Sequence, residues 1–151
     1  TTLEPNLGIV QLSDFRNFAV ADIPGIIEGA HEGKGLGLRF LRHIERTRVL
    51  AFLIPIDSDN PKETYDLLRK EIENYSEELS RRPHCVVFTK KDLNTSAFDI
   101  DTYDFPAAWG VFEISSVSRI GIDLLLESVW GEIQEAIQVE VNSAEEDFWD
   151  F

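Results

Sequence analysis

The chain has 151 residues, which suits one domain with one hydrophobic core, and its net charge of −14 argues against a general nucleic-acid surface, where cations must meet phosphates. No apolar run approaches the ~20 residues of a membrane-spanning helix. The single cysteine, Cys85, permits no internal disulfide, so we expect a cytoplasmic protein in which Cys85 packs as a small hydrophobic residue.

The first part of the chain predicts two strands, a glycine-rich segment and a helix. Short alternating runs predict strands at 8–12 and 15–22, close enough in sequence for a hairpin. The glycine-rich segment ADIPGIIEGAHEGKGLG follows them. From Leu38 the apolar spacing becomes that of a helix, on which three cations share a face: Arg39, Arg42 and Arg46.

The rest of the chain alternates strands with helices. The continuous apolar run at 49–57 predicts a strand that is covered on both faces. A helix is predicted from Asn60-Pro61 to about Arg82-Pro83. Two more strands are predicted at 85–89 and 109–115, and a last helix at 121–138. This order predicts an α/β domain with a mainly parallel sheet between helices.

An Asp-x-x-Gly motif at Asp22–Gly25 follows the second predicted strand. An aspartate in this position can hold a water molecule on Mg²⁺, and Gly25 allows a backbone N–H to approach a terminal phosphate. The pattern also fits an ordinary turn. At Thr1–Leu3 a threonine hydroxyl precedes the first strand and suits the oxygen-only coordination of Mg²⁺.

Two further motifs follow the later strands. In TKKD, Thr89–Asp92, a carboxylate can accept two parallel N–H bonds from guanine, which adenine cannot donate. In ISSV, Ile114–Val117, backbone and hydroxyl groups are placed to meet the base oxygen. A charged turn and helix capping are the respective alternatives.

The order and spacing of these motifs are those of a P-loop GTPase beyond its phosphate-binding loop. The stretches TTLEPNLGIV, ADIPGIIEGAHEGKGLGLRFLRHIERTRVL, FTKKDL and ISSVSRIGIDLLL resemble the GTP-binding domain of the Obg GTPases, over essentially the whole chain up to the tail. The resemblance implies a Ras-like, P-loop NTPase-like domain at 1–139, followed by an acidic and aromatic tail at 140–151. It also implies GTP and GDP binding, Mg²⁺ as cofactor, slow GTP hydrolysis and work on the large ribosomal subunit.

The resemblance further implies individual site residues. Thr2 would ligate Mg²⁺ directly and Asp22 through water, while Asp92 would select guanine and Lys91 would act as a spacer. The implied GTP-binding set is Thr1, Thr2, Leu3, Glu4, Asp22, Ile23, Pro24, Gly25, Thr89, Lys90, Lys91, Asp92, Ser115, Ser116 and Val117.

The sequence departs from the family pattern in two places. Thr89 replaces the asparagine of Asn-Lys-x-Asp, and a hydroxyl cannot bond with both ends of an amide. The phosphate-binding loop Gly-x-x-x-x-Gly-Lys-Ser/Thr is absent, since GAHEGKG at 29–35 is one residue short and ends in glycine. We therefore expect a domain that is incomplete on its N-terminal side, without the family's glycine-rich N-terminal domain, and inactive on its own.

The sequence assigns no catalytic residue. Ile26 stands where Ras-like enzymes place the glutamine that orients water, and Glu28 and His31 are open alternatives. The cationic face of Arg39, Arg42 and Arg46 suits either ribosomal RNA or solvent. Two other functions stay open: a related developmentally regulated translation GTPase, and a non-hydrolysing interaction module. We expect a monomer without a membrane span.

Overall fold

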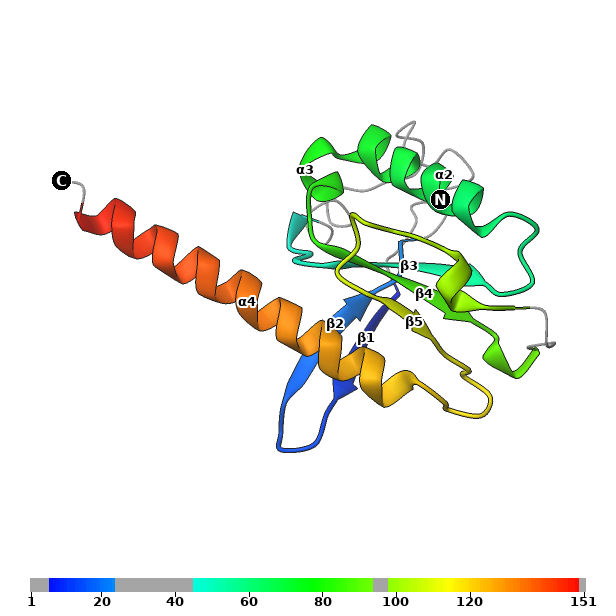
Figure 1. The fold of residues 1–151 in the computed structure, drawn as a ribbon. Helices are drawn as coiled ribbons and strands as arrows, with labels where there is room; N and C mark the ends of the chain where they lie inside the picture. The colour runs from blue at the N-terminus through cyan, green and yellow to red at the C-terminus, as the bar shows by residue number, and fades with distance from the viewer. Residues whose placement is uncertain (1–5, 24–44, 94–97, 150–151) are drawn as a thin grey trace.

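The computed structural model describes residues 6–23, 45–93 and 98–149 (Figure 1). Its main elements, in chain order, are β1 (Leu7–Gln11), β2 (Asn17–Ala21), β3 (Leu50–Pro55), α2 (Pro61–Tyr75), α3 (Glu77–Ser80), β4 (His84–Thr89), β5 (Val111–Glu113) and α4 (Ile122–Trp149). Two short 3₁₀ helices, η2 (Lys91–Leu93) and η3 (Ile100–Thr102), lie between β4 and β5. Within these described ranges, no helix is both long and apolar enough to cross a membrane.

The described strands form two sheets. Strands β3, β4 and β5 are parallel in that order, with Phe52 opposite Val86 and Val86 opposite Val111. Strands β1 and β2 form a separate antiparallel hairpin. Helices pack on both faces of the parallel sheet, so the predicted α/β class with a mainly parallel sheet is confirmed.

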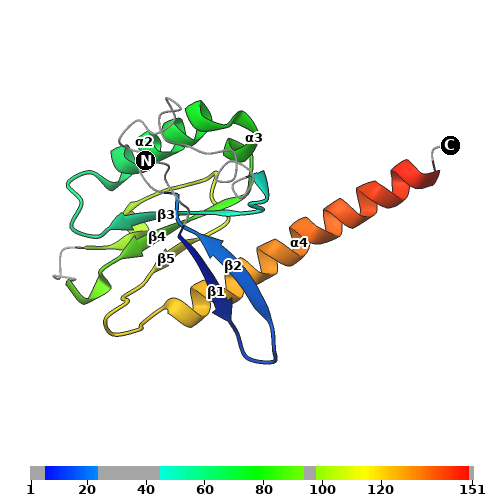
Figure 2. The ribbon, with the colours of Figure 1, turned by 180° about the vertical axis from the view of Figure 1, so that it is seen from behind.

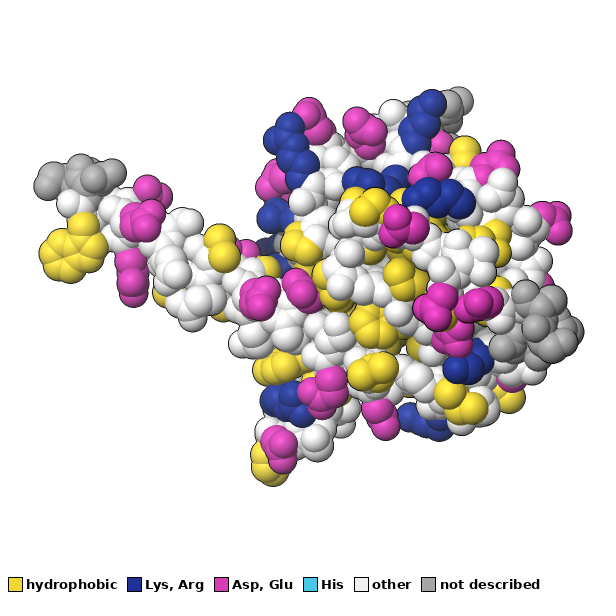
Figure 3. All heavy atoms as spheres, in the orientation of Figure 1, with side chains coloured by type: hydrophobic (Ala, Val, Ile, Leu, Met, Phe, Trp, Pro, Cys, Tyr) yellow, Lys and Arg dark blue, Asp and Glu magenta, His cyan; other side chains and the backbone are white. Residues whose placement is uncertain are grey.

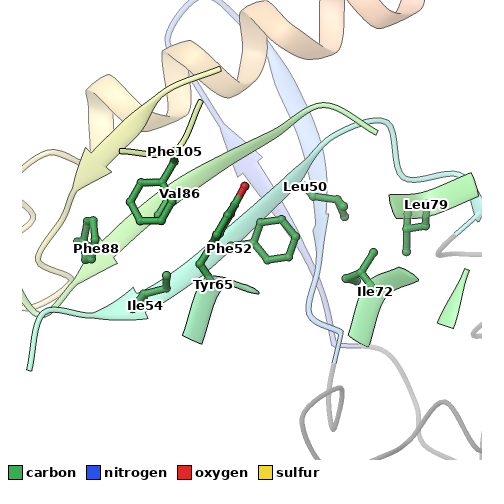
Figure 4. Packing of buried hydrophobic residues seen from close by; sticks show 9 residues of the cluster. All are labelled: Leu50, Phe52, Ile54, Tyr65, Ile72, Leu79, Val86, Phe88 and Phe105. Carbon is green, nitrogen blue, oxygen red and sulfur yellow. The ribbon is translucent and has the colours of Figure 1, made fainter. Parts of the chain in front are cut away.

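The larger hydrophobic core lies between the parallel sheet and α2 with α3. Figure 4 shows its buried side chains, which come from the sheet, from both helices and from the segment before β5: Leu50, Phe52, Ile54, Tyr65, Ile72, Leu79, Val86, Phe88 and Phe105. Aromatic rings dominate this cluster, and Phe52 and Phe105 both meet Tyr65 edge-on. Such contacts add to the hydrophobic stabilisation that burial supplies.

A buried polar pair lies inside this core. The Tyr65 hydroxyl and His84 Nε2 are 2.6 Å apart, and only 4% of His84 is exposed. Burial, assisted by the nearby positive charge of Arg69, lowers the pKa of His84 from 6.5 to about 4. The imidazole is therefore neutral at pH 7, and its Nε2 shares a hydrogen bond with the Tyr65 hydroxyl.

The opposite face of the sheet packs against α4. Cys85, Val87 and Ile114 form a second cluster with Ile122 and Leu125 of the helix. Trp109 Nε1 also donates a hydrogen bond to Ser128 Oγ of α4 at 3.0 Å. Cys85 is fully buried, and burial raises the pKa of its thiol to about 12, which agrees with its predicted role as a small hydrophobic residue.

Strand β3 is covered on one face only, so the prediction of coverage on both faces is wrong for the described residues. Leu50, Phe52 and Ile54 are buried, whereas Ala51 is exposed and 54% of the surface of Leu53 is accessible to solvent. The reason is that α4 lies over β4 and β5, and nothing else in the described residues covers the second face of β3. By contrast, residues 84–88 of β4 are buried on both faces.

Two predicted helices differ from the observed ones. The helix expected to run to Arg82-Pro83 is divided at Ser76, whose extended backbone ends α2 and whose hydroxyl accepts the Leu79 N–H to cap α3. The last helix was predicted to end at Gln138 but continues to Trp149, because residues 139–149 contain neither glycine nor proline. The predicted boundary between domain and tail falls inside α4 and stays a prediction.

The hairpin turn between β1 and β2 has an unusual backbone. Its residues Asp14 and Phe15 both have positive φ, 66° and 61°, which is the left-handed region that residues other than glycine, asparagine and aspartate seldom adopt. The Phe15 side chain is fully exposed at the tip. The predicted hairpin is confirmed.

Candidate functional site

The structure brings two of the four predicted motifs together. The strand β4 ends in the TKKD segment and the parallel strand β5 ends in the ISSV segment, so both lie at the same edge of the sheet. Ser115 Oγ donates a hydrogen bond to Asp92 Oδ1 at 2.9 Å, across 23 positions of sequence. This bond couples the carboxylate predicted to select guanine to the loop predicted to close over the base.

Several contacts fix the TKKD segment against its neighbours. Thr89 lies at the end of β4, where its carbonyl accepts the Ile56 N–H at 3.1 Å. Lys91 donates its backbone N–H to the Ile114 carbonyl at 3.0 Å, and its Nζ lies 2.8 Å from Glu113 Oε2. Between them Lys90 has φ of 62°, a left-handed conformation that turns the chain sharply.

The ISSV loop is organised around Ser115, which is fully buried. Its backbone N–H bonds to the Ile120 carbonyl at 3.0 Å, and its hydroxyl oxygen accepts the Ser118 N–H at 3.1 Å. Gly121 closes the loop with φ of 76°, and a Cβ at this position would clash with the Glu113 carbonyl oxygen. The sequence therefore needs glycine here to return the chain to α4.

The outer side of these two loops is open to solvent. Lys90, Asp92, Ser116 and Val117 are exposed, with 84% of Val117 accessible. One oxygen of Asp92 is engaged by Ser115, and the carboxylate remains accessible for donors arriving from outside. The arrangement offers an oriented, solvent-accessible carboxylate at the edge of the sheet, which suits a ligand with two neighbouring N–H groups.

The phosphate and metal side of the predicted site is described only in part. Asp22 follows β2, its backbone N–H bonds to the Asn6 carbonyl at 2.9 Å, and its carboxylate is exposed. Ile23 packs against the larger core. The remaining residues of that side lie outside the described ranges: Thr1, Thr2, Leu3, Glu4, Pro24 and Gly25.

Other predicted residues also fall outside the described ranges. These are Ile26, Glu28, His31, Arg39 and Arg42, while Arg46 is described and exposed. The described part of the chain contains no group of three or more His, Cys, Asp or Glu side chains that could hold a metal ion together.

Sequence reasoning missed two residues that shape the loops. Glu113 forms an ion pair with Lys91, which the resemblance places in the GTP-binding set as a spacer, and Gly121 allows the ISSV loop to close against the Glu113 carbonyl. A glycine at the first position of the predicted helix 121–138 was the available signal for Gly121. No pattern singled out Glu113, because an acidic residue inside a short strand has many ordinary explanations.

Comparison with known proteins agrees with this geometry. A family model described as "50S ribosome-binding GTPase" matches residues 1–90. The chain is 50% identical to the GTPase Obg of Chloroherpeton thalassium over 142 residues, which cover 93% of this chain and 42% of the relative. It is 48% identical to the GTPase Obg of Porphyromonas gingivalis over 134 residues, which cover 88% of this chain and 34% of the relative.

The chain thus spans 34–42% of the length of these relatives. The resemblance to Obg proteins is confirmed at the level of sequence, and the α/β architecture is that of a P-loop GTPase domain. Because the family match covers more than half of its residues, the chain belongs to the family of 50S ribosome-binding GTPases.

Proposed function

We propose that the full-length protein binds GTP through the loops at 89–92 and 114–117 and hydrolyses it slowly as a conformational switch. The observation that carries the proposal is the Ser115–Asp92 hydrogen bond, which joins the two loops at one edge of the sheet. The relatives named GTPase Obg support the same conclusion.

Guanine is the base that this arrangement suits. Asp92 faces outward with one oxygen fixed, so its carboxylate can accept from the ring N–H and the exocyclic amine of guanine together. Lys90 would lie along the base plane, and Val117 would supply apolar contact on the same side. Thr89, which replaces the usual asparagine, lies at the end of β4 and contributes its carbonyl to Ile56.

Magnesium fits the proposed site as a nucleotide-held ion. The exposed carboxylate of Asp22 is an oxygen group of the kind that Mg²⁺ contacts through water. Mg²⁺ commonly binds through one or two protein groups and the phosphates of its nucleotide. When bound, the ion would neutralise charge that develops on the phosphates, and Asp22 would orient its water shell. Thr2 is the proposed direct ligand.

Base selection can be tested by changing Asp92 to Asn in the full-length protein. An amide presents an N–H to the carbonyl of xanthine where the carboxylate accepted from the guanine amine, so preference should move from GTP to xanthosine triphosphate. The measurement is the Kd for both nucleotides by calorimetry. Asp101→Asn, an exposed aspartate in η3, is the control and should keep the original preference. Unchanged discrimination in Asp92→Asn would remove this residue from the site.

We further propose that the nucleotide state controls binding to the large ribosomal subunit. The description of the matched family and the cationic spacing of Arg39, Arg42 and Arg46 support this. Replacing all three with Ala should flatten the salt dependence of particle binding, by about 0.7–0.9 in the log–log slope for each lost phosphate contact. Binding at several salt concentrations, with GDP and with a non-hydrolysable GTP analogue, provides the measurement. An unaltered slope would favour a solvated face.

A further inference from the structure

The second half of α4 leaves the body of the protein. Figures 1 and 2 show the helix packed on the sheet near its start and extending away from it toward the C-terminus. Residues 139–149, here called distal α4, are all exposed. They include large apolar side chains, with 45% of Val141, 70% of Phe148 and 79% of Trp149 accessible.

The first half of the same helix carries a similar pair of side chains, which residues of the β1–β2 hairpin contact. Arg16 of the hairpin donates to both carboxylate oxygens of Glu127, at 2.8 and 2.9 Å. Its guanidinium also lies 5.6 Å from the centre of the Trp130 ring, and Phe18 meets the same ring at 6.5 Å. An arginine and an aromatic side chain of the hairpin thus contact a Glu-x-x-Trp pair on α4.

Distal α4 repeats this pair on the same side of the helix. Glu145 and Phe148 follow Glu127 and Trp130 by 18 residues each, which corresponds to five turns at about 3.6 residues per turn. Val141 lies on the same face between the two pairs. Arg16 and Phe18 contact the proximal pair, where Trp130 is partly buried and Glu127 stays exposed, whereas on the distal pair Glu145 is exposed and 70% of Phe148 is accessible.

The charge of α4 defines what can cover the distal pair. The helix carries eight acidic residues and no Lys, Arg or His between Ile122 and Trp149. Figure 3 shows acidic and hydrophobic side chains along its projecting part. Carboxylates in the last helical turn oppose the helix dipole, so cations are the favourable neighbours there. A second acidic residue of α4 also pairs with an arginine of the rest of the domain. Glu140, near the start of distal α4, lies 3.2 Å from the guanidinium of Arg48.

We propose that distal α4 is a docking surface for a basic, amphipathic segment of another protein. Arginine side chains of that segment meet Glu145 and its neighbours, and apolar side chains cover Val141 and Phe148, as Arg16 and Phe18 do on the proximal pair. A second copy of this helix is unsuitable as the partner, because two strongly acidic helices without basic residues repel each other. Nucleic acid is unsuitable for the same reason. This proposal goes beyond the GTPase function and does not depend on it.

The test uses the full-length protein and a labelled synthetic helix of about 20 residues, long enough for helix formation, with leucine on one face and arginine beside it. Fluorescence anisotropy should show saturable binding that weakens as salt rises. Changing Glu145→Gln together with Phe148→Ala should weaken it by about tenfold. Gln and Ala both favour helix, so circular dichroism should report an unchanged helix content.

The matched control is Glu73→Gln with Phe15→Ala, which removes an exposed glutamate and an exposed aromatic ring that both lie outside distal α4 and should leave peptide binding unchanged. The same peptide with glutamate in place of arginine should not bind. Equal affinity for the two peptides, equal loss in both double variants, or no binding of the basic peptide would overturn the proposal. So would sedimentation that shows a dimer which Phe148→Ala dissociates, since a second copy would then be the occupant.

Discussion

The hydroxyl of Ser115 joins the loops at 89–92 and 114–117, and its removal should lower both the stability of the protein and the proposed affinity for GTP. Ser115→Ala removes the donor to Asp92 at 2.9 Å and the acceptor of the Ser118 N–H at 3.1 Å. A neutral hydrogen bond contributes about 1 kcal/mol, and one to a charged group about 1.5–3 kcal/mol. Because Asp92 is exposed, water can replace part of the hydrogen bond that its carboxylate loses. We therefore expect Ser115→Ala to lower the free energy of unfolding by about 2 kcal/mol in total.

Urea unfolding of the full-length protein measures this cost, provided that the slope of unfolding free energy against urea is unchanged. Because the loops are then less well ordered before binding, the Kd for GTP should rise by about tenfold. Ser116→Ala is the control, since Ser116 is exposed beside the buried Ser115, and its effect should stay within about 0.5 kcal/mol. If the two variants behave alike, the Ser115–Asp92 bond does not organise the site.

Two more predictions concern the rest of the fold. The pKa of His84 in the folded protein, about 4, lies below its unfolded value of 6.5. The unfolded state therefore binds a proton first as the pH falls, so the free energy of unfolding should be unaffected by His84 above pH 6.5 and should decrease by about 3 kcal/mol as the pH drops toward 4. Urea unfolding at several pH values should show a flatter profile for His84→Gln, and an unchanged profile would exclude His84 as the cause. Phe18→Ala should expose the amides of the β1–β2 hairpin to faster hydrogen exchange while β4 stays protected, because an isolated hairpin is marginal without α4. Val20→Ala, at a half-exposed position, should have little effect, and similar exchange in the two variants would contradict this role for Phe18.

The sequence predicted what is encoded locally. The alternation of apolar runs with helical spacing sufficed for the α/β class, and the TKKD and ISSV segments were placed correctly at the ends of β4 and β5. Their meeting was foreseeable because neighbouring parallel strands end at one edge of a sheet.

Features that depend on tertiary packing were not predicted. The exposure of Leu53 follows from which strands α4 covers, and nothing in an apolar run reports that. The break at Ser76 lies within a continuous helical pattern, where a capping serine is also compatible with helix. The ion pair between Lys91 and Glu113 joins residues 22 positions apart in sequence, which no local pattern encodes.

The hairpin tip has a consequence for the engineering of this protein. A bulky residue in the left-handed region costs roughly 1–2 kcal/mol, and Phe15 adopts that region. Its ring is fully exposed, so burial of the side chain does not offset this cost. Glycine adopts this region without strain, and asparagine adopts it more readily than phenylalanine does. Replacing Phe15 with glycine should therefore raise the thermostability of the domain, at a position outside the loops at 89–92 and 114–117 that we propose to bind GTP.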